Sequence, residues 1–173
     1  MVRKATAADI PQIAAIYTHI HDGEEAGKTT IGWIRDVYPT EDTARTALAA
    51  DDLFVMEEDG AVVAAARINR EQVPVYAQVP WRYPEVPEEQ VMVLHTLVVE
   101  PARSGKGYGT AFVWFYEDYA RQNGCPYLRM DTNARNSAAR RLYAGLGYWE
   151  AGIEPCVFNG IPDVKLVCLE KKL

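Results

Sequence analysis

Three glycines at alternating positions, Gly105, Gly107 and Gly109, lie between an apolar run and a segment with helical spacing. Glycine lets a ligand approach the backbone closely, and the first N–H groups of a helix have no partner within the helix. The helix dipole adds partial positive charge there, so this stretch predicts an anion site. Two nucleotide-binding patterns fail, because Lys106 is not followed by Ser or Thr and Phe112 stands where a dinucleotide site needs glycine.

A second candidate pair is formed by Asn136 and Tyr143, which are seven residues apart in a segment with helical spacing. At 3.6 residues per turn they share one helix face and stand about 10 Å apart along the axis. Tyrosine keeps its proton at neutral pH, so Tyr143 can serve as a proton donor through a hydrogen bond that strengthens as charge develops. The alternative is that Tyr143 is a core residue at the end of the helix.

These residues need two strands and two helices to position them. The apolar run Val91 to Val99 is typical of a strand buried on both faces, and the glycine turn after it opens into a helix. Tyr127 to Asp131 predicts a second strand, and a shorter helix follows that ends at Gly147.

Upstream, Thr6 and Asp9 form a predicted capping box that starts a helix, and Gly23 marks its end. Asp59-Gly60, between two alternating apolar runs, is a strong hairpin signal. The remaining predicted elements are a strand at Arg3 to Ala5, a helical stripe at Thr30 to Tyr38, a helix at Thr43 to Ala50, strands at Leu53 to Glu57 and Ala61 to Asn69, and strands at Trp149 to Ile153, Val157 to Phe158 and Val164 to Leu169 with Asn159-Gly160 as a turn.

The segment Glu71 to Gln90 contains four prolines and three large aromatic residues, so it is predicted to be neither a helix nor a central strand. Long irregular segments inside compact domains are usually functional or disordered, and the aromatic residues argue against disorder. We expect a lid or wall beside a substrate site, or else a loop packed on the surface.

Length and composition favour one domain, residues 1–173, because 173 residues with 49% hydrophobic content can bury a sizeable core. The net charge of −6 argues against nucleic acid as a partner. Between Pro101 and Arg141, seven bases stand against three acids, a local charge of +4 that leaves −10 elsewhere and fits a small polyanion. We expect a cytoplasmic protein, since no signal peptide or long apolar run is present, and no metal site, since the three cysteines lack ligand spacing and suit buried thiols.

The central stretch closely resembles the GCN5-related N-acetyltransferases (GNAT), whose pattern is a strand, R/Q-x-x-G-x-G/A, a helix, and then N-x-x-A-x-x-x-Y followed by L-G-Y/F. The second part is complete here as Asn136, Ala139, Tyr143 and Leu146-Gly147-Tyr148. The first part departs at one position, where Ser104 replaces the Arg or Gln and the nearest arginine, Arg103, comes one residue early.

The resemblance implies an α/β (α+β) fold, a mixed central sheet with helices on both faces and a V-shaped gap between the fourth and fifth strands. It implies acetyl-CoA as cofactor and a primary amine of a small molecule or peptide as acceptor, with Trp33 and Tyr38 as candidate wall residues and Tyr143 as proton donor. The implied cofactor contacts are the backbone of Leu97, Val98 and Val99, the pyrophosphate turn of Ser104, Gly105, Lys106, Gly107, Tyr108, Gly109 and Thr110, and Asn136.

For the base, the resemblance points to His95, because L-H-T-L-V-V is similar to the L-H-A-L-A-V of serotonin N-acetyltransferases, in which that histidine serves the amine. Asp131 is the second candidate, since it matches the position of an acid in ribosomal-protein acetyltransferases, and solvent is the third. A non-catalytic acyl-CoA-binding sensor is the alternative function. A homodimer is one possible oligomeric state, because the sequence does not indicate how many copies assemble.

Overall fold

The computed structural model describes residues 1–173 and contains a seven-stranded sheet in the order β1-β2-β3-β4-β5-β7-β6. Neighbouring strands are antiparallel except β4 and β5, which are parallel. The predicted element order and mixed α/β fold class are confirmed. The elements are β1 (Val2–Lys4), α1 (Ile10–Glu25), α2 (Glu41–Ala49), β2 (Leu53–Glu58), β3 (Ala61–Asn69), β4 (Val91–Val99), α3 (Tyr108–Gln122), β5 (Tyr127–Asn133), α4 (Ser137–Gly145), β6 (Trp149–Phe158) and β7 (Ile161–Lys172).

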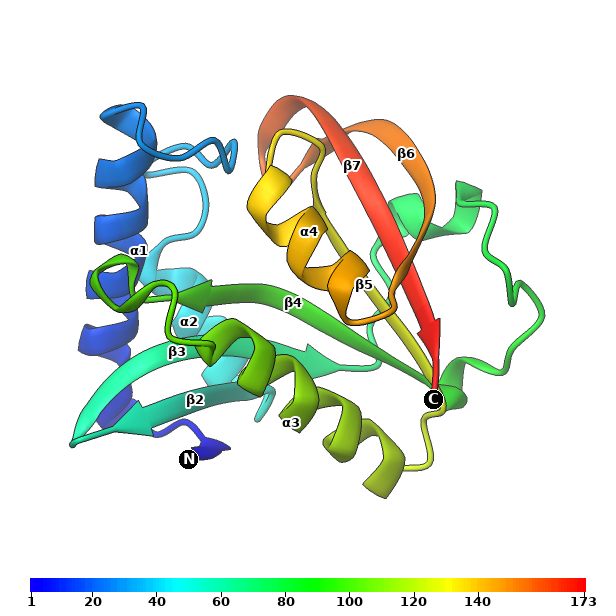
Figure 1. Cartoon of the computed structure of the whole chain (residues 1–173), viewed down its shortest axis with the longest axis horizontal. Coiled ribbons are helices and arrows are strands. Elements are labelled where there is room, and N and C mark those ends of the chain that lie inside the picture. Colours follow the sequence, from blue (N-terminus) through cyan, green and yellow to red (C-terminus); the bar gives the residue numbers. More distant parts are fainter.

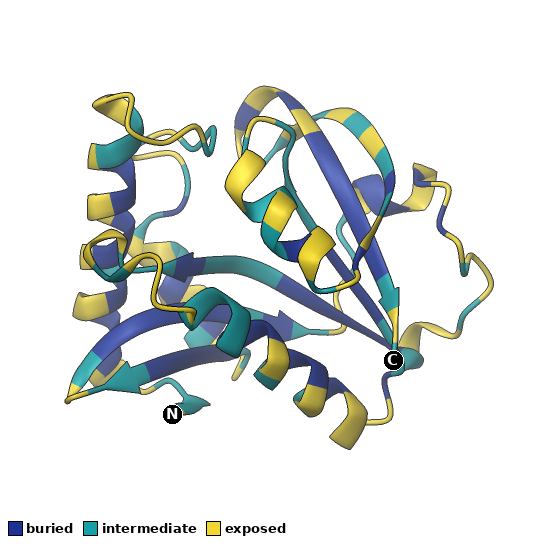
Figure 2. Ribbon diagram, in the orientation of Figure 1, coloured by how far each residue is buried: buried dark blue, intermediate teal, exposed yellow.

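Helices cover both faces of the sheet (Figure 1). On one face, α3 and α4 bury Phe112, Tyr116 and Tyr143 against the strands, and on the other face α1 and α2 bury residues such as Ile13 and Ala47. The buried segments therefore follow the strands and the inward sides of the helices (Figure 2). This arrangement is the one that the apolar runs of the sequence predict.

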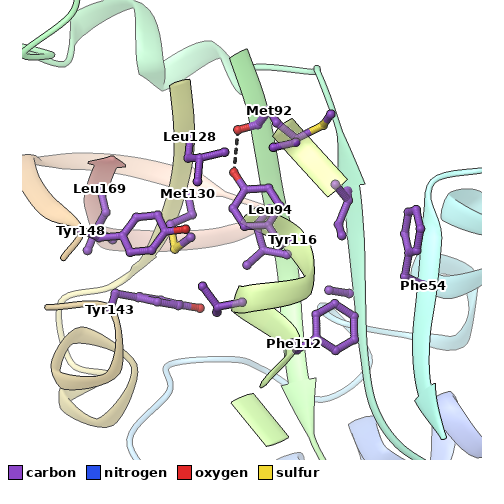
Figure 3. Close-up of a cluster of buried hydrophobic side chains, with 14 of the residues drawn as sticks. Phe54, Met92, Leu94, Phe112, Tyr116, Leu128, Met130, Tyr143, Tyr148 and Leu169 are labelled. Carbon is purple, nitrogen blue, oxygen red and sulfur yellow. Dashed lines mark hydrogen bonds between the residues drawn. The ribbon is translucent and has the colours of Figure 1, made fainter. Parts of the chain in front are cut away.

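Tyr116 fixes α3 across the two parallel strands. Its hydroxyl donates to Met92 O at 2.6 Å and lies 3.2 Å from Arg129 O, so one buried phenol reaches both β4 and β5 (Figure 3). Burial of that ring in a core with Leu128 and Met130 keeps the two strands together at this level of the sheet.

Two hairpin turns form where the sequence predicts them. Asp59 and Gly60 have φ values of 53° and 75°, and Asn159 and Gly160 have 51° and 77°. Both central residues of a type I′ turn need positive φ, which Asn, Asp and Gly adopt at least cost. The Thr6 and Asp9 capping box also forms, with Thr6 N donating to Asp9 Oδ2 at 2.8 Å.

The helical stripe predicted over Thr30 to Tyr38 is wrong. The segment is irregular, and it folds back on itself so that Ile34 and Tyr38 form an isolated bridge around Asp36, whose φ is 60°. Outside contacts override the helical spacing, because Glu24 accepts the backbone N–H groups of Ile31 at 2.6 Å and Gly32 at 2.9 Å.

Two boundaries also differ from the prediction. The helix α1 continues past Gly23 to Glu25, and the two short strands expected after Gly147 are one strand, β6, with two register shifts. Bulges of this kind bend a strand without ending its pairing, so the alternation of the sequence is interrupted while the strand continues. None of the helices has the length and apolar content that crossing a bilayer requires.

Candidate active site

A gap opens in the middle of the sheet, where β4 and β5 separate. The two strands pair from Val91 with Tyr127 to Leu94 with Met130, and no further. Beyond that point β4 stays paired with β3 and β5 stays paired with β7. The edge of Leu97 to Val99 that faces β5 therefore has no strand partner, as the resemblance implies.

The gap leads into a cavity of about 600 Å³. Its walls come from six places, namely Thr96 to Val99 of β4, Pro101 and Ser104 in the turn after it, Asp131 to Asn133 of β5, the first two turns of α4 with its N-cap, the C-terminal part of α1 with the segment after it, and the hairpin of β6 and β7. Elements that are far apart in the sequence thus enclose one space next to the unpaired edge of β4.

A bulge in β4 decides which side chains face this cavity. The register shifts opposite Ala65 and Arg67, and Thr96 has a φ of 53°, which is unusual for a β-branched residue. Before the bulge, Met92 and Leu94 face the core under α3, and after it Leu97 and Val99 pack against that same core. One inserted residue has therefore reversed the phase of the strand.

The glycine turn forms the predicted start of α3. Gly105 and Gly107 have φ values of 78° and 82°, and a side chain on either would extend into open space. The first N–H of the helical ladder is that of Ala111, which donates to Gly107 O at 2.9 Å. The N–H groups of the first turn, from Tyr108 to Thr110, precede that ladder and fit an anionic phosphate.

Gly109 has a different reason to be glycine. A Cβ there would lie 3.2 Å from Leu142 Cδ2 and 3.9 Å from Val99 Cγ2, so its small size lets α4 pack closely on α3. Tyr108 also turns away, because its hydroxyl donates to Glu58. Among the turn residues, only Ser104 lines the cavity itself.

Asn136 and Tyr143 both line the cavity. Asn136 is the N-cap of α4, because its Oδ1 accepts from Ala139 N at 3.1 Å, which leaves its amide NH₂ as a donor. Tyr143 is buried, and burial raises the pKa of its phenol, so it stays protonated. Its oxygen accordingly carries a proton at the cavity wall.

Asp131 is the carboxyl group nearest to this tyrosine in the cavity wall. Its Oδ2 accepts a hydrogen bond from Tyr76 Oη at 2.7 Å. Burial raises the pKa of Asp131 to about 6, although the Tyr76 hydrogen bond opposes the shift. Burial, and to a smaller extent the charge of Asp131, raises the pKa values of Tyr38 and Tyr143, and all three residues line the cavity.

The sequence profile described as "Acetyltransferase (GNAT) family" matches residues 15–148, which contain the split strands, the glycine turn and α4. The chain belongs to this family. The match confirms the resemblance that the two motifs indicate, in spite of Ser104 at the Arg or Gln position.

The chain is also similar to individual proteins of known sequence or structure. "Uncharacterized N-acetyltransferase YhfO" of Bacillus subtilis is 32% identical over 95 residues, which are 55% of this chain and 63% of that protein. An acetyltransferase of the GNAT family from Streptococcus agalactiae has a TM-score of 0.81 at 19% identity, covering 100% of this chain and 95% of its own. The putative acetyltransferase yncA of Salmonella typhimurium, solved with its cofactor acetyl-CoA, has a TM-score of 0.70 at 23% identity, covering 100% and 93%.

The GNAT assignment does not make His95 the base, and the structure does not bring this residue to the cavity. His95 Nε2 lies 2.9 Å from Asn69 Oδ1, on the side of the sheet away from Leu97. Burial and the neighbouring Arg67 lower the pKa of His95 to about 4. Simple alternation would place His95 and Leu97 on one face of the strand, and the bulge at Thr96 separates them.

The local positive charge contributes less to anion binding than its count suggests. Five of the seven bases between Pro101 and Arg141 form ion pairs, for example Arg103 with Glu58 at 3.5 Å and Arg140 with Glu150 at 2.8 Å. The other two, Lys106 and Arg141, are exposed. The groups left to attract a polyanion are therefore the N–H groups of the glycine turn and these two side chains.

The segment Glu71 to Gln90 is not a lid. It packs on the surface, with Tyr76 and Trp81 buried in a core together with strands β4, β6 and β7, and none of its residues lines the cavity. The buried pair of Arg129 and Glu170, 3.2 Å apart, anchors it, because Arg129 Nη2 also donates to Tyr83 O at 2.9 Å. Its contribution to the site is indirect, through the hydrogen bond from Tyr76 to Asp131.

Trp33 and Tyr38 do line the cavity, as expected of wall residues. Sequence patterns do not predict the wall residues that come from the hairpin of β6 and β7. They are Phe158, Asn159, Ile161, Val164 and Leu166. The sequence feature that indicates them is the Asn159-Gly160 turn, because a hairpin turn brings the end of β6 and the start of β7 together.

Proposed function

We propose that this GNAT protein is an acetyl-CoA-dependent N-acetyltransferase that acetylates a primary amine by direct attack. The observation that carries the proposal is that a half-buried carboxyl, Asp131, and a buried phenol, Tyr143, line the same cavity beside the unpaired edge of β4. A group that takes a proton and a group that gives one are what amide formation requires. No covalent enzyme intermediate is needed.

Several groups of this chain fit acetyl-CoA. The unpaired edge of Leu97 to Val99 would pair with the pantetheine arm, the turn from Ser104 to Thr110 would hold the pyrophosphate, and the amide NH₂ of Asn136 is a free donor. When bound, acetyl-CoA would supply the thioester carbonyl that the amine attacks and the sulfur that leaves as the C–S bond breaks. Asp131 would take the proton that the amine loses, and Tyr143 Oη would give a proton to the leaving sulfur.

Turnover distinguishes this proposal from the alternative, a sensor that binds acyl-CoA without reacting. We expect release of free thiol when the protein and acetyl-CoA are mixed with primary amines, together with an acetylated product by mass spectrometry. Calorimetry measures acetyl-CoA binding in parallel. Binding without thiol release for every amine would favour the sensor.

The glycine turn provides a prediction on affinity. In Gly107→Ala the new Cβ enters the space before the first turn of α3, where φ is 82°, so we expect the Kd for coenzyme A to rise by about tenfold or more. Gly124→Ala is the matched control, because Gly124 has a φ of 70° with open space around it and lies beyond the other end of α3. Both variants bear similar backbone strain of about 1 kcal/mol. Equal Kd values in the two would refute the phosphate site.

A further inference from the structure

The end of the cavity beyond Asp131 is built from aromatic and aliphatic side chains. Trp33 and Tyr38 form one wall, with ring centroids 5.8 Å apart in an edge-to-face contact. Phe158, Ile161, Val164 and Leu166 also line this end, and Trp33, Tyr38 and Phe158 pack against the core cluster that contains the other three. The Tyr38 hydroxyl is already bonded to Thr96 Oγ1, so this wall presents apolar surface more than free polar groups.

Charged groups are scarce in this part of the cavity. Asp131 is half-buried in this part, while the other acid in the lining, Asp22, lies on α1 and pairs with Arg35 at 2.6 Å. Lys28 is the one lysine or arginine in the lining, and it is exposed on the loop that follows α1. The strands and the hairpin around Asp131 provide no cation to the lining.

A strap closes the side of the cavity between α1 and the end of β5. The segment Glu24 to Trp33 extends from α1 toward the loop before α4 (Figure 1), and Thr30 Oγ1 donates to Arg135 O at 3.1 Å. Gly32 touches Asn133 so closely that a Cβ would lie 2.4 Å from Asn133 Nδ2. This contact leaves less room for an extended peptide than for a compact molecule.

We infer that the acceptor is a small primary amine on an aromatic or aliphatic body that carries no carboxylate. The inference rests on the proposed acetyl transfer and narrows its substrate class. A carboxylate beside Asp131 would be desolvated among apolar side chains, with a like charge nearby and no cation from the surrounding strands. An apolar body would instead contact the apolar lining that Trp33, Tyr38 and Phe158 share.

The same walls assist the chemistry. An alkylammonium has an ordinary pKa of about 10, and transfer into apolar surroundings disfavours its charged form. Burial meanwhile raises the pKa of Asp131 to about 6. Both shifts bring the proton affinities of amine and carboxyl closer together, so an apolar acceptor loses its proton more easily than one that brings further charges.

A set of matched amines tests the inferred class of acceptor substrate. We expect kcat/KM for phenethylamine to exceed those for phenylalanine, for putrescine and for a short peptide with a free N-terminus by about tenfold or more. A higher value for any of these three would overturn the inference while leaving acetyl transfer intact. No thiol release with any amine at saturating acetyl-CoA would overturn the proposed function itself.

A pair of neighbouring variants tests the wall. Phe158→Ala should raise KM for phenethylamine by about tenfold, because loss of one methylene from an apolar pocket is already worth roughly 10- to 200-fold in specificity, and should change KM for ethylamine much less. Val157→Ala is the control, since Val157 is adjacent in β6, 72% exposed and outside the lining. Equal KM values for phenethylamine in the two variants would refute the wall assignment.

Discussion

Replacement of Asp131 by asparagine is expected to lower kcat/KM by about 10²- to 10⁴-fold, the usual contribution of a general base, without loss of acetyl-CoA binding. Asparagine has the size of aspartate, and its Oδ1 can still accept the hydrogen bond that Tyr76 Oη gives at 2.7 Å. It cannot take a proton from the amine. Steady-state thiol release and calorimetry on the same preparation measure the two quantities.

The role of Asp131 as a base also predicts the direction in which kcat/KM changes with pH. Asp131 acts as a base only when ionised, so kcat/KM should rise with pH up to about 6, the pKa to which burial raises this carboxyl, and level off above it. Burial and the charge of Asp131 raise the pKa values of Tyr38, Tyr76, Tyr143, Cys156 and Cys168, so these groups are neutral in this range. Tyr76→Phe removes the hydrogen bond that stabilises the carboxylate and should move the limb to higher pH.

Stability should change in the opposite direction to activity. Burial raises the pKa of Asp131 from 3.8 to about 6, so the folded protein binds this proton more tightly than the unfolded chain does. The favourable contribution is complete below pH 3.8 and is lost as the pH rises through about 6. At pH 7, Asp131→Asn should therefore increase the free energy of unfolding in urea, by up to about 3 kcal/mol, and the gain should shrink toward pH 4.

His95→Gln is the comparison for this experiment. Because His95 faces Asn69 and lies outside the cavity lining, the variant should keep the limb near pH 6. Loss of the limb in His95→Gln with its retention in Asp131→Asn would make the histidine the base. If both variants kept the limb, the amine would lose its proton to solvent.

The sequence predicts well what depends on local chemistry. The Asp59-Gly60 and Asn159-Gly160 turns, the Thr6 capping box and the apolar run of β4 all follow from the conformational limits of a few residues, and the structure has each of them. The pattern around Asn136 and Tyr143 places both on one face of α4, toward the cavity. These features need no knowledge of distant contacts.

What the sequence does not predict depends on tertiary contacts. Nothing in the string of apolar residues marks Thr96 as a bulge, yet that residue moves His95 out of the site and turns Leu97 toward it. Likewise, the role of Tyr76 depends on the anchoring of its segment by Arg129 and Glu170, which are 41 residues apart in the chain. Sequence patterns therefore do not predict which face of β4 a side chain occupies after the bulge, or which distant residues anchor a segment.

The Tyr143 hydroxyl is the second group expected to have a large effect. Tyr143 Oη has no hydrogen-bond partner in the protein. It is not among the fully buried polar atoms without a partner, because His21 Nδ1 is the only such atom. Tyr143 Oη is therefore accessible, and the cavity that Tyr143 lines is where it is exposed. Burial raises the pKa of Tyr143 and keeps its proton in place. A sulfur that leaves with a pKa of about 8.5 needs such a donor.

Tyr143→Phe removes only that hydroxyl, so we expect kcat to fall by about 10²-fold or more while acetyl-CoA affinity and the free energy of unfolding stay close to those of the wild type. Tyr148→Phe is the matched control. Its ring packs 6.0 Å from that of Tyr143, but its hydroxyl donates to Glu117 Oε1 at 3.1 Å and lies outside the cavity lining. Tyr148→Phe should therefore lower the free energy of unfolding by about 1 kcal/mol with little change in kcat. If Tyr143→Phe instead loses stability and keeps its turnover, Tyr143 is a core residue and the proton comes from elsewhere.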